Sequence, residues 1–113
     1  MAGVLRKGDV VGANLDPVVG HEQAGQRPVL IISDDILKRK SGTVIAMAVT
    51  SKEPKAGYPL PLALSQRLAR KQAWIKITQI RTLSTKRLGR ILGRVDDLDM
   101  ATILEGLNEV LGN

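Results

Sequence analysis

Short apolar runs separated by glycine, proline and polar residues make up most of the chain. Residues 27–33 and 43–50 are continuous, brief and rich in β-branched side chains, a pattern typical of strands that are buried on both faces. Residues 10–15 form a third run, which stops at an Asp-Pro turn pair. We expect weaker strands at residues 60–64, 73–78 and within 87–95.

One segment has clear helical periodicity. Apolar side chains within residues 100–111 recur at intervals of three and four and form one stripe. Asp96 is the expected N-cap, Asp99 lies at the third helical position near the positive end of the helix dipole, and Gly112 predicts the C-terminal stop. A shorter helical turn is expected at residues 34–40. Short strands closed by a terminal helix favour a small, strongly curved sheet or half-open barrel.

Length and composition narrow the class of protein. A chain of 113 residues predicts a single domain over residues 1–113. Zero cysteines exclude disulfide and thiolate chemistry, and one histidine leaves no cluster with zinc-ligand spacing. The apolar runs are shorter than the ~18–20 residues of a membrane span, and no apolar core follows the N-terminus as in a signal peptide. We therefore expect a soluble, cytoplasmic protein with no metal, no cofactor and no membrane partner.

Charge is unevenly distributed along the chain. Seventeen Lys and Arg against eleven Asp and Glu give a net charge of +6, and every base precedes Asp96, while five of the acids follow from there. This asymmetry favours a polyanion as partner of the main body, although a solvated basic surface beside an acidic helix remains an alternative. Trp74 and Tyr58 are the only aromatic residues, which argues against base-stacking platforms. Recognition would then rest on cations, backbone amides and hydrogen-bonding side chains.

Four blocks occur in order along nearly the whole chain: LDPVVGHEQAGQRPVLIIS at residues 15–33, AVTS at 48–51, ITQIRT at 77–82, and RLGRILGRVDD at 87–97. Together they resemble the MazF/PemK family of toxin endoribonucleases. The resemblance implies a mainly β fold with α elements: an SH3-like small barrel of short antiparallel strands with a C-terminal helix, the MazF/CcdB-like toxin fold. It also implies a homodimer and a cognate antitoxin with an acidic, disordered C-terminal segment, with which the toxin joins a DNA-binding complex.

The activity that the resemblance implies is metal-independent, sequence-specific cleavage of single-stranded RNA, leading to bacterial growth arrest. In this chemistry the ribose 2′-hydroxyl attacks the adjacent phosphorus and leaves 2′,3′-cyclic phosphate and 5′-hydroxyl ends. The enzyme must accept a proton, offset charge on the pentacoordinate phosphorus and assist the departing 5′-oxygen.

Two residues are the first candidates for that chemistry. The guanidinium of Arg27 matches phosphate oxygens bidentately, and it corresponds to the catalytic arginine of the family's Arg-Pro pair. The structural alternative is an ion pair with Asp16 or Glu22 at the start of a strand. Thr50 ends a buried strand, where its hydroxyl would bind a phosphate oxygen; the alternative is an ordinary strand threonine.

The polar loop at residues 17–26 supplies three more candidates. Glu22 acts as a base if its pKa is raised, or else holds Arg27 in place, and His21 titrates nearest neutrality. Gln23 orders the loop or hydrogen-bonds a base edge. Several family members carry an acid where Thr78 stands, so the general base stays open among Glu22, His21 and Arg27.

Further positions are expected to bind RNA, namely Ser51, Lys52, Lys55, Lys76, Thr78, Gln79 and Arg81. Arg81 has two alternatives, a dimer contact and a hydrogen-bonding brace of the core. A basic cluster at Arg67, Arg70 and Lys71 is either a guide for the RNA backbone or a solvated face.

Two other functions fit the same fold. CcdB-like toxins share this barrel, poison gyrase and cleave nothing, and an inactive nucleic-acid-binding barrel is a third possibility that the neutral Thr78 supports. The QAGQRP segment and the AVTS block favour the ribonuclease, because a gyrase poison needs no arginine–threonine pair.

Overall fold

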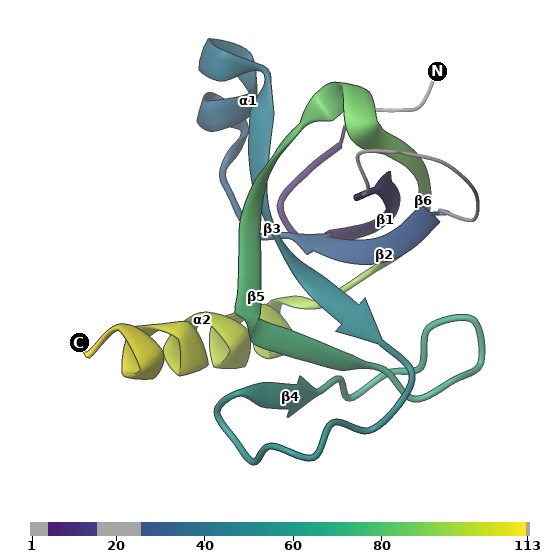
Figure 1. Ribbon diagram of the computed structural model, residues 1–113, viewed down its shortest axis with the longest axis vertical. Helices are drawn as coiled ribbons and strands as arrows, with labels where there is room; N and C mark the ends of the chain where they lie inside the picture. The colour runs from purple at the N-terminus through teal and green to yellow at the C-terminus, as the bar shows by residue number, and fades with distance from the viewer. Residues whose placement is uncertain (1–4, 16–25, 113) are drawn as a thin grey trace.

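The computed structural model describes residues 5–15 and 26–112. Within them, six antiparallel strands form one sheet in the order β4-β5-β3-β2-β1-β6. The strands are β1 (Asp9–Asn14), β2 (Gln26–Ile31), β3 (Thr43–Thr50), β4 (Pro61–Ala63), β5 (Trp74–Ser84) and β6 (Leu88–Arg94). The helices are α1 (Asp35–Ser41), a 3₁₀ turn η1 (Thr85–Arg87) and α2 (Asp97–Leu111). Figure 1 shows β1, β2 and β6 curling over at one end of the sheet while α2 crosses β5. The expected fold class, a small antiparallel β barrel with a C-terminal helix, is confirmed.

One strand is longer than the sequence predicts, and the strand expected within residues 87–95 is confirmed as β6. β5 continues to Ser84, six residues beyond the expected end at Thr78. Its residues 78–82 are all exposed, so this half of the strand lacks the apolar alternation that identifies strands in a sequence. β6 is a strand despite its helix-like apolar spacing, because its backbone pairs with β1.

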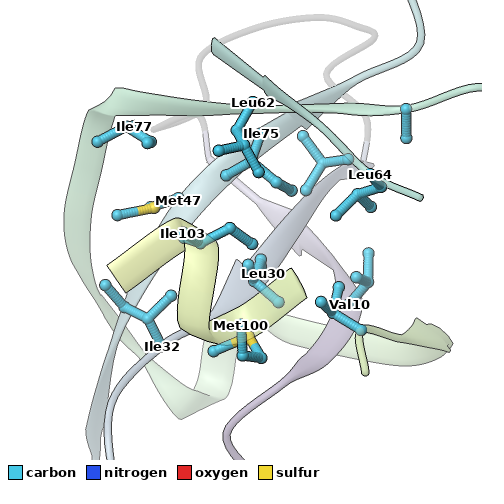
Figure 2. Packing of buried hydrophobic residues seen from close by; sticks show 13 residues of the cluster. Val10, Leu30, Ile32, Met47, Leu62, Leu64, Ile75, Ile77, Met100 and Ile103 are labelled. Carbon is cyan, nitrogen blue, oxygen red and sulfur yellow. The ribbon is translucent and has the colours of Figure 1, made fainter. Parts of the chain in front are cut away.

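The core lies on both faces of the sheet. Leu30 packs in a cluster between the sheet and α2, whereas its neighbours Val29 and Ile31 pack in a second cluster inside the curl. Because successive side chains of a strand point to opposite faces, this arrangement confirms that β2 is buried on both sides. Figure 2 shows the first cluster, in which Met100 and Ile103 of α2 face the labelled sheet residues Val10, Leu30, Ile32, Met47, Leu62, Leu64, Ile75 and Ile77.

Both ends of α2 follow the sequence prediction. The Asp96 carboxylate accepts a hydrogen bond of 2.9 Å from the Asp99 N–H, and Gly112 ends the helix with a φ of 87°. The predicted apolar stripe is only partly buried, because Val110 and Leu111 remain exposed at the C-terminal end. No helix among the described residues has the length and apolar character needed to cross a membrane.

A buried carboxylate joins the first and last strands. Asp9 is 3% exposed, and its side chain accepts a 2.9 Å bond from the Arg6 N–H and a 2.7 Å bond from the Arg94 guanidinium. Asp9 and Arg94 are also opposite each other in the β1–β6 pairing. The ion pair therefore fixes the turn before β1 and the end of β6 at the same point.

Replacing that carboxylate should destabilise the fold. We expect Asp9→Ala to lower the free energy of unfolding by about 2 kcal/mol, because two hydrogen bonds to a charged group are lost. The loss is not larger because the Arg94 side chain is 45% exposed, so water solvates its unpaired charge. The melting temperature should fall by roughly 10 °C. Asp97→Ala, at an exposed acid, is the control and should change stability by less than about 1 kcal/mol. Equal losses in the two variants would contradict a structural role for Asp9.

Candidate functional site

A groove of about 690 Å³ opens between the sheet and the segment that joins β4 to β5. Arg27 from β2 and Thr50 from β3 both line it, together with Lys76, Gln79 and Arg81 from β5. Ser51, directly after β3, lines it as well. Six of the site residues singled out in the sequence, from three blocks far apart along the chain, therefore share one cavity.

Strand register explains how Arg27 and Thr50 come together. In the β2–β3 pairing, Val29 lies opposite Ala48. Continuing that antiparallel register by two residues on each strand places Arg27 opposite Thr50. Directly opposite residues project their side chains to the same face of a sheet, where they are near neighbours.

The next strand adds two cations to the same face. Ala48 pairs with Lys76 of β5, and Ala46 pairs with Arg81. Because Ala46, Ala48 and Thr50 alternate along β3 on one side, Lys76 and Arg81 lie on the face that carries Thr50. Three neighbouring strands thus deliver one hydroxyl and three cations to one side of the sheet.

An irregularity in β5 sets the place of Gln79. The register shifts between Met47, which lies opposite Ile80, and Ala48, which lies opposite Lys76. The extra residues on β5 bend the strand, and the bend is visible halfway along β5 in Figure 1. Gln79 is directed into the groove by this bend, whereas the exposed Thr78 is not among the residues that line it.

Among the described residues, the charged side chains that line the groove are all positive. Arg27, Lys71, Lys76 and Arg81 line it, and no carboxylate does among the described residues. Its floor is apolar, with Val10, Ala48 and Val49, so charge–charge attraction at its walls is less screened than on an open surface. Such a groove suits a chain of phosphodiesters.

The Thr50 hydroxyl is held in a defined place. Its oxygen accepts a 3.1 Å hydrogen bond from the Lys52 N–H, which closes a turn directly after β3. A hydroxyl that accepts in this way still carries its own proton, which it can donate to an anion in the groove. The structural and functional interpretations of Thr50 are thus compatible.

Other residues named from the sequence lie elsewhere. Lys52 and Lys55 are exposed and are not among the residues that line the groove. His21, Glu22 and Gln23 lie outside the described residues, as does Asp16. Among the described residues, no group of three or more His, Cys, Asp or Glu side chains could hold a metal ion.

Sequence analysis named Arg70 and Lys71 only as members of a basic cluster and did not predict the hairpin that carries them, which forms one wall of the groove. Leu68, Ala69, Lys71 and Gln72 line the cavity. Ala69 and Arg70 form the turn with φ angles of 51° and 68°. Turns with two positive φ angles normally contain Asn, Asp or Gly, so an Ala-Arg pair carries no turn signal that could have identified this hairpin.

The chain matches a family model described as "PemK-like, MazF-like toxin of type II toxin-antitoxin system" over residues 6–111. It is 38% identical over 106 residues to Endoribonuclease EndoA of Bacillus subtilis (strain 168), covering 92% of this chain and 91% of that protein. Its fold matches a MazE–MazF crystal structure from Deinococcus radiodurans with a TM-score of 0.80 at 29% identity, covering 96% of each chain. It also matches a mycobacterial endoribonuclease in complex with its cognate antitoxin, with a TM-score of 0.78, 25% identity and 96% of each chain covered.

The hairpin turn should be measurably strained. An L-residue in the left-handed region costs roughly 1–2 kcal/mol, and glycine removes that cost while adding entropy to the unfolded chain. We expect Ala69→Gly to raise the free energy of unfolding by about 1 kcal/mol in denaturant titration. Ala101→Gly makes the same chemical change at an exposed position of α2 and should lower stability by about 1 kcal/mol. Destabilisation by both variants would show that the turn is unstrained.

Proposed function

This chain belongs to the PemK-like and MazF-like toxins of type II toxin–antitoxin systems, and from that premise we propose that it is an endoribonuclease whose groove binds and cleaves single-stranded RNA. The observation that carries the proposal is that Arg27 and Thr50 line the same basic groove. A guanidinium and a hydroxyl at neighbouring positions can hold two oxygens of one phosphate. We propose that the chain is one toxin domain.

Arg27 stabilises the reacting phosphate. As the 2′-hydroxyl oxygen bonds to phosphorus, negative charge develops on the non-bridging oxygens, and the two parallel N–H donors of a guanidinium match them. A guanidinium is a poor proton donor, so the role of Arg27 is electrostatic. Thr50 donates its hydroxyl proton to the same phosphate and helps to orient it.

The remaining groove residues bind the rest of the RNA. Lys76 and Arg81 neutralise phosphates on either side of the reacting one, since they lie on the same sheet face as Thr50. Gln79 and Ser51 offer hydrogen bonds to base edges, which supply the sequence preference. We extend the proposed RNA contacts to Gln23, Lys52, Lys55 and Thr78.

Proton transfer is assigned to the loop before β2. Glu22 or His21 accepts the proton of the 2′-hydroxyl, and the departing 5′-oxygen is protonated in turn. Glu22 and His21 precede Arg27 in the chain by only five and six positions, a separation short enough for them to contribute to a site at Arg27. DNA lacks the 2′-hydroxyl nucleophile, so selectivity for RNA follows from the reaction and requires no metal ion.

The basic groove also explains the proposed partners. An acidic, disordered segment of a cognate antitoxin would be attracted to the four cations that bind RNA, and would block the groove by occupying it. We propose that the toxin acts as a cytoplasmic homodimer whose RNA cleavage arrests growth until the antitoxin is replenished.

RNA cleavage is directly testable. Purified protein incubated with EDTA should cut a long single-stranded transcript at a short recurring motif and leave 2′,3′-cyclic phosphate and 5′-hydroxyl ends, detected by end mapping. A single 2′-deoxy substitution at the nucleotide 5′ of a mapped cut should abolish cleavage there, because the nucleophile is removed. RNA that stays intact at stoichiometric protein would overturn the proposal, and inhibition of gyrase supercoiling by the same preparation would favour the CcdB-like alternative.

Substitutions of Arg27 distinguish the contribution of its bidentate hydrogen bonds from that of its positive charge. We expect Arg27→Ala to lower kcat by about 10²–10³ or more, measured on the mapped transcript, with an unchanged circular dichroism spectrum. Arg27→Lys keeps the charge but loses the bidentate fork, so it should recover only part of the rate. Arg39→Ala removes a cation from α1, away from the groove, and should leave the rate unchanged. Cleavage retained by Arg27→Ala would remove the central assignment.

A further inference from the structure

The connection between β4 and β5 is a hairpin with an unusual tip. Leu68 and Lys71 exchange two backbone hydrogen bonds of 2.9 Å, so Ala69 and Arg70 are the only two residues of the turn. Both have positive φ angles, as a two-residue type I′ turn requires. Non-glycine residues adopt this conformation only where the surrounding structure imposes it, and such positions concentrate at ligand sites.

Contacts with two other elements hold the hairpin in place. A Cβ atom added to Gly93 of β6 would lie only 2.8 Å from Leu68 Cδ2, so the Leu68 side chain sits directly on the glycine backbone. On the other side, the backbone N–H and the hydroxyl of Ser65 both donate to Asp99 Oδ2 of α2, at 2.9 and 2.8 Å. The hairpin is therefore fixed against β6 and against the first turn of α2.

The stem of the hairpin is also closed internally. Leu64 donates its N–H to the Ala73 carbonyl at 2.9 Å, and the Gln72 side-chain amide donates to the carbonyls of Leu64 and Ala73, at 2.9 and 3.1 Å. Ala73 leads directly into β5, which carries Lys76. The hairpin and the basic face of the sheet are thus parts of one rigid piece.

The tip carries positive charge along the groove. Lys71 lines the cavity opposite the strands, and exposed Arg70 is next to it at the turn. No carboxylate lines this wall among the described residues. A rigid, cationic wall of the groove that Arg27 also lines is suited to holding the backbone of a polyanion without ordering a loop at the moment of binding.

We propose that residues 64–73 form a preformed clamp for the RNA backbone, in which Arg70 and Lys71 bind phosphates outside the scissile one. The proposal rests on the function proposed above, and it assigns these two cations to substrate affinity and not to chemistry. Because the clamp is shaped during folding, RNA binding needs no further ordering of this wall. A solvated basic surface, the alternative, would contribute nothing to RNA affinity.

The test compares two double variants that each remove two positive charges. Arg70→Asn/Lys71→Gln neutralises the clamp while keeping a residue that tolerates positive φ at the tip. Arg39→Gln/Lys40→Gln neutralises exposed residues of α1, on the opposite side of the molecule in Figure 1 and not among the residues lining the groove. Binding is measured by fluorescence anisotropy on an RNA of the mapped motif with one 2′-deoxy nucleotide at the cut, between 50 and 200 mM salt (roughly the range over which phosphate contacts dominate).

We expect the clamp variant to raise Kd about tenfold at low salt and to lower the slope of log K against log salt by about 1.4, which is about 0.7 for each lost phosphate contact on a single strand. KM for the cleavable RNA should rise in parallel, with kcat changed by less than about twofold. The α1 variant should keep the slope of the wild type.

Other outcomes would overturn the proposal. An unchanged Kd and salt slope in the clamp variant would show that the hairpin is a solvated face. An equal loss of affinity in both variants would show that only the net charge of the protein matters. A fall in kcat alone would show that Arg70 and Lys71 take part in the chemical step. A wild-type protein that cuts no transcript, and so gives no mapped motif, would instead refute the proposed function. The same binding comparison on an unstructured poly(U) RNA would still decide the role of the clamp.

Discussion

The pairing of β3 with β2 on one side and β5 on the other is the constraint on which the groove depends. Opposite residues in this pairing bring Lys76 beside Ala48 and, by extension of the register, Arg27 beside Thr50. A slip of one residue would send each of these side chains to the other face of the sheet. Since Val29 and Ala46 occupy the same face within the second core cluster, that slip would also expose the core. Burial of apolar side chains therefore enforces the register that assembles the site.

Departures from regular structure concentrate around this site. The register shift in β5 directs Gln79 into the groove, and the positive φ angles of Ala69 and Arg70 shape its opposite wall. The bend lies in β5, which continues directly from the hairpin, and the hairpin is held by hydrogen bonds in its stem and by packing on Gly93. A regular sheet would be easier to fold, but it would have neither the bend nor the raised wall. Local strain is stable here because neighbouring elements determine the conformation.

The distribution of charge in the fold lets one surface serve both proposed partners, RNA and the antitoxin. Every Lys and Arg precedes α2 in the chain, the acids of α2 are not among the residues that line the groove, and Asp99 supports its wall by accepting hydrogen bonds from Ser65. Long-range attraction speeds the arrival of any polyanion, whether nucleic acid or an acidic peptide. Competition between RNA and antitoxin for the same cations then follows from electrostatics without a conformational switch.

Local chemistry in the sequence was enough to determine several elements. The caps at Asp96 and Gly112 and the doubly buried strand around Leu30 follow from side-chain type and spacing, because capping and alternation act over a few residues. A resemblance spread over four blocks predicted Arg27 and Thr50 as site residues, and both line the groove. The second half of β5 and the hairpin at Ala69 were decided only by the tertiary structure. Exposed polar residues became strand because β3 supplied hydrogen-bond partners, and Ala-Arg became a turn because Gly93 and Asp99 anchor both sides of it. Those partners are distant in the chain, so no short window of sequence contains the energy that selects the conformation.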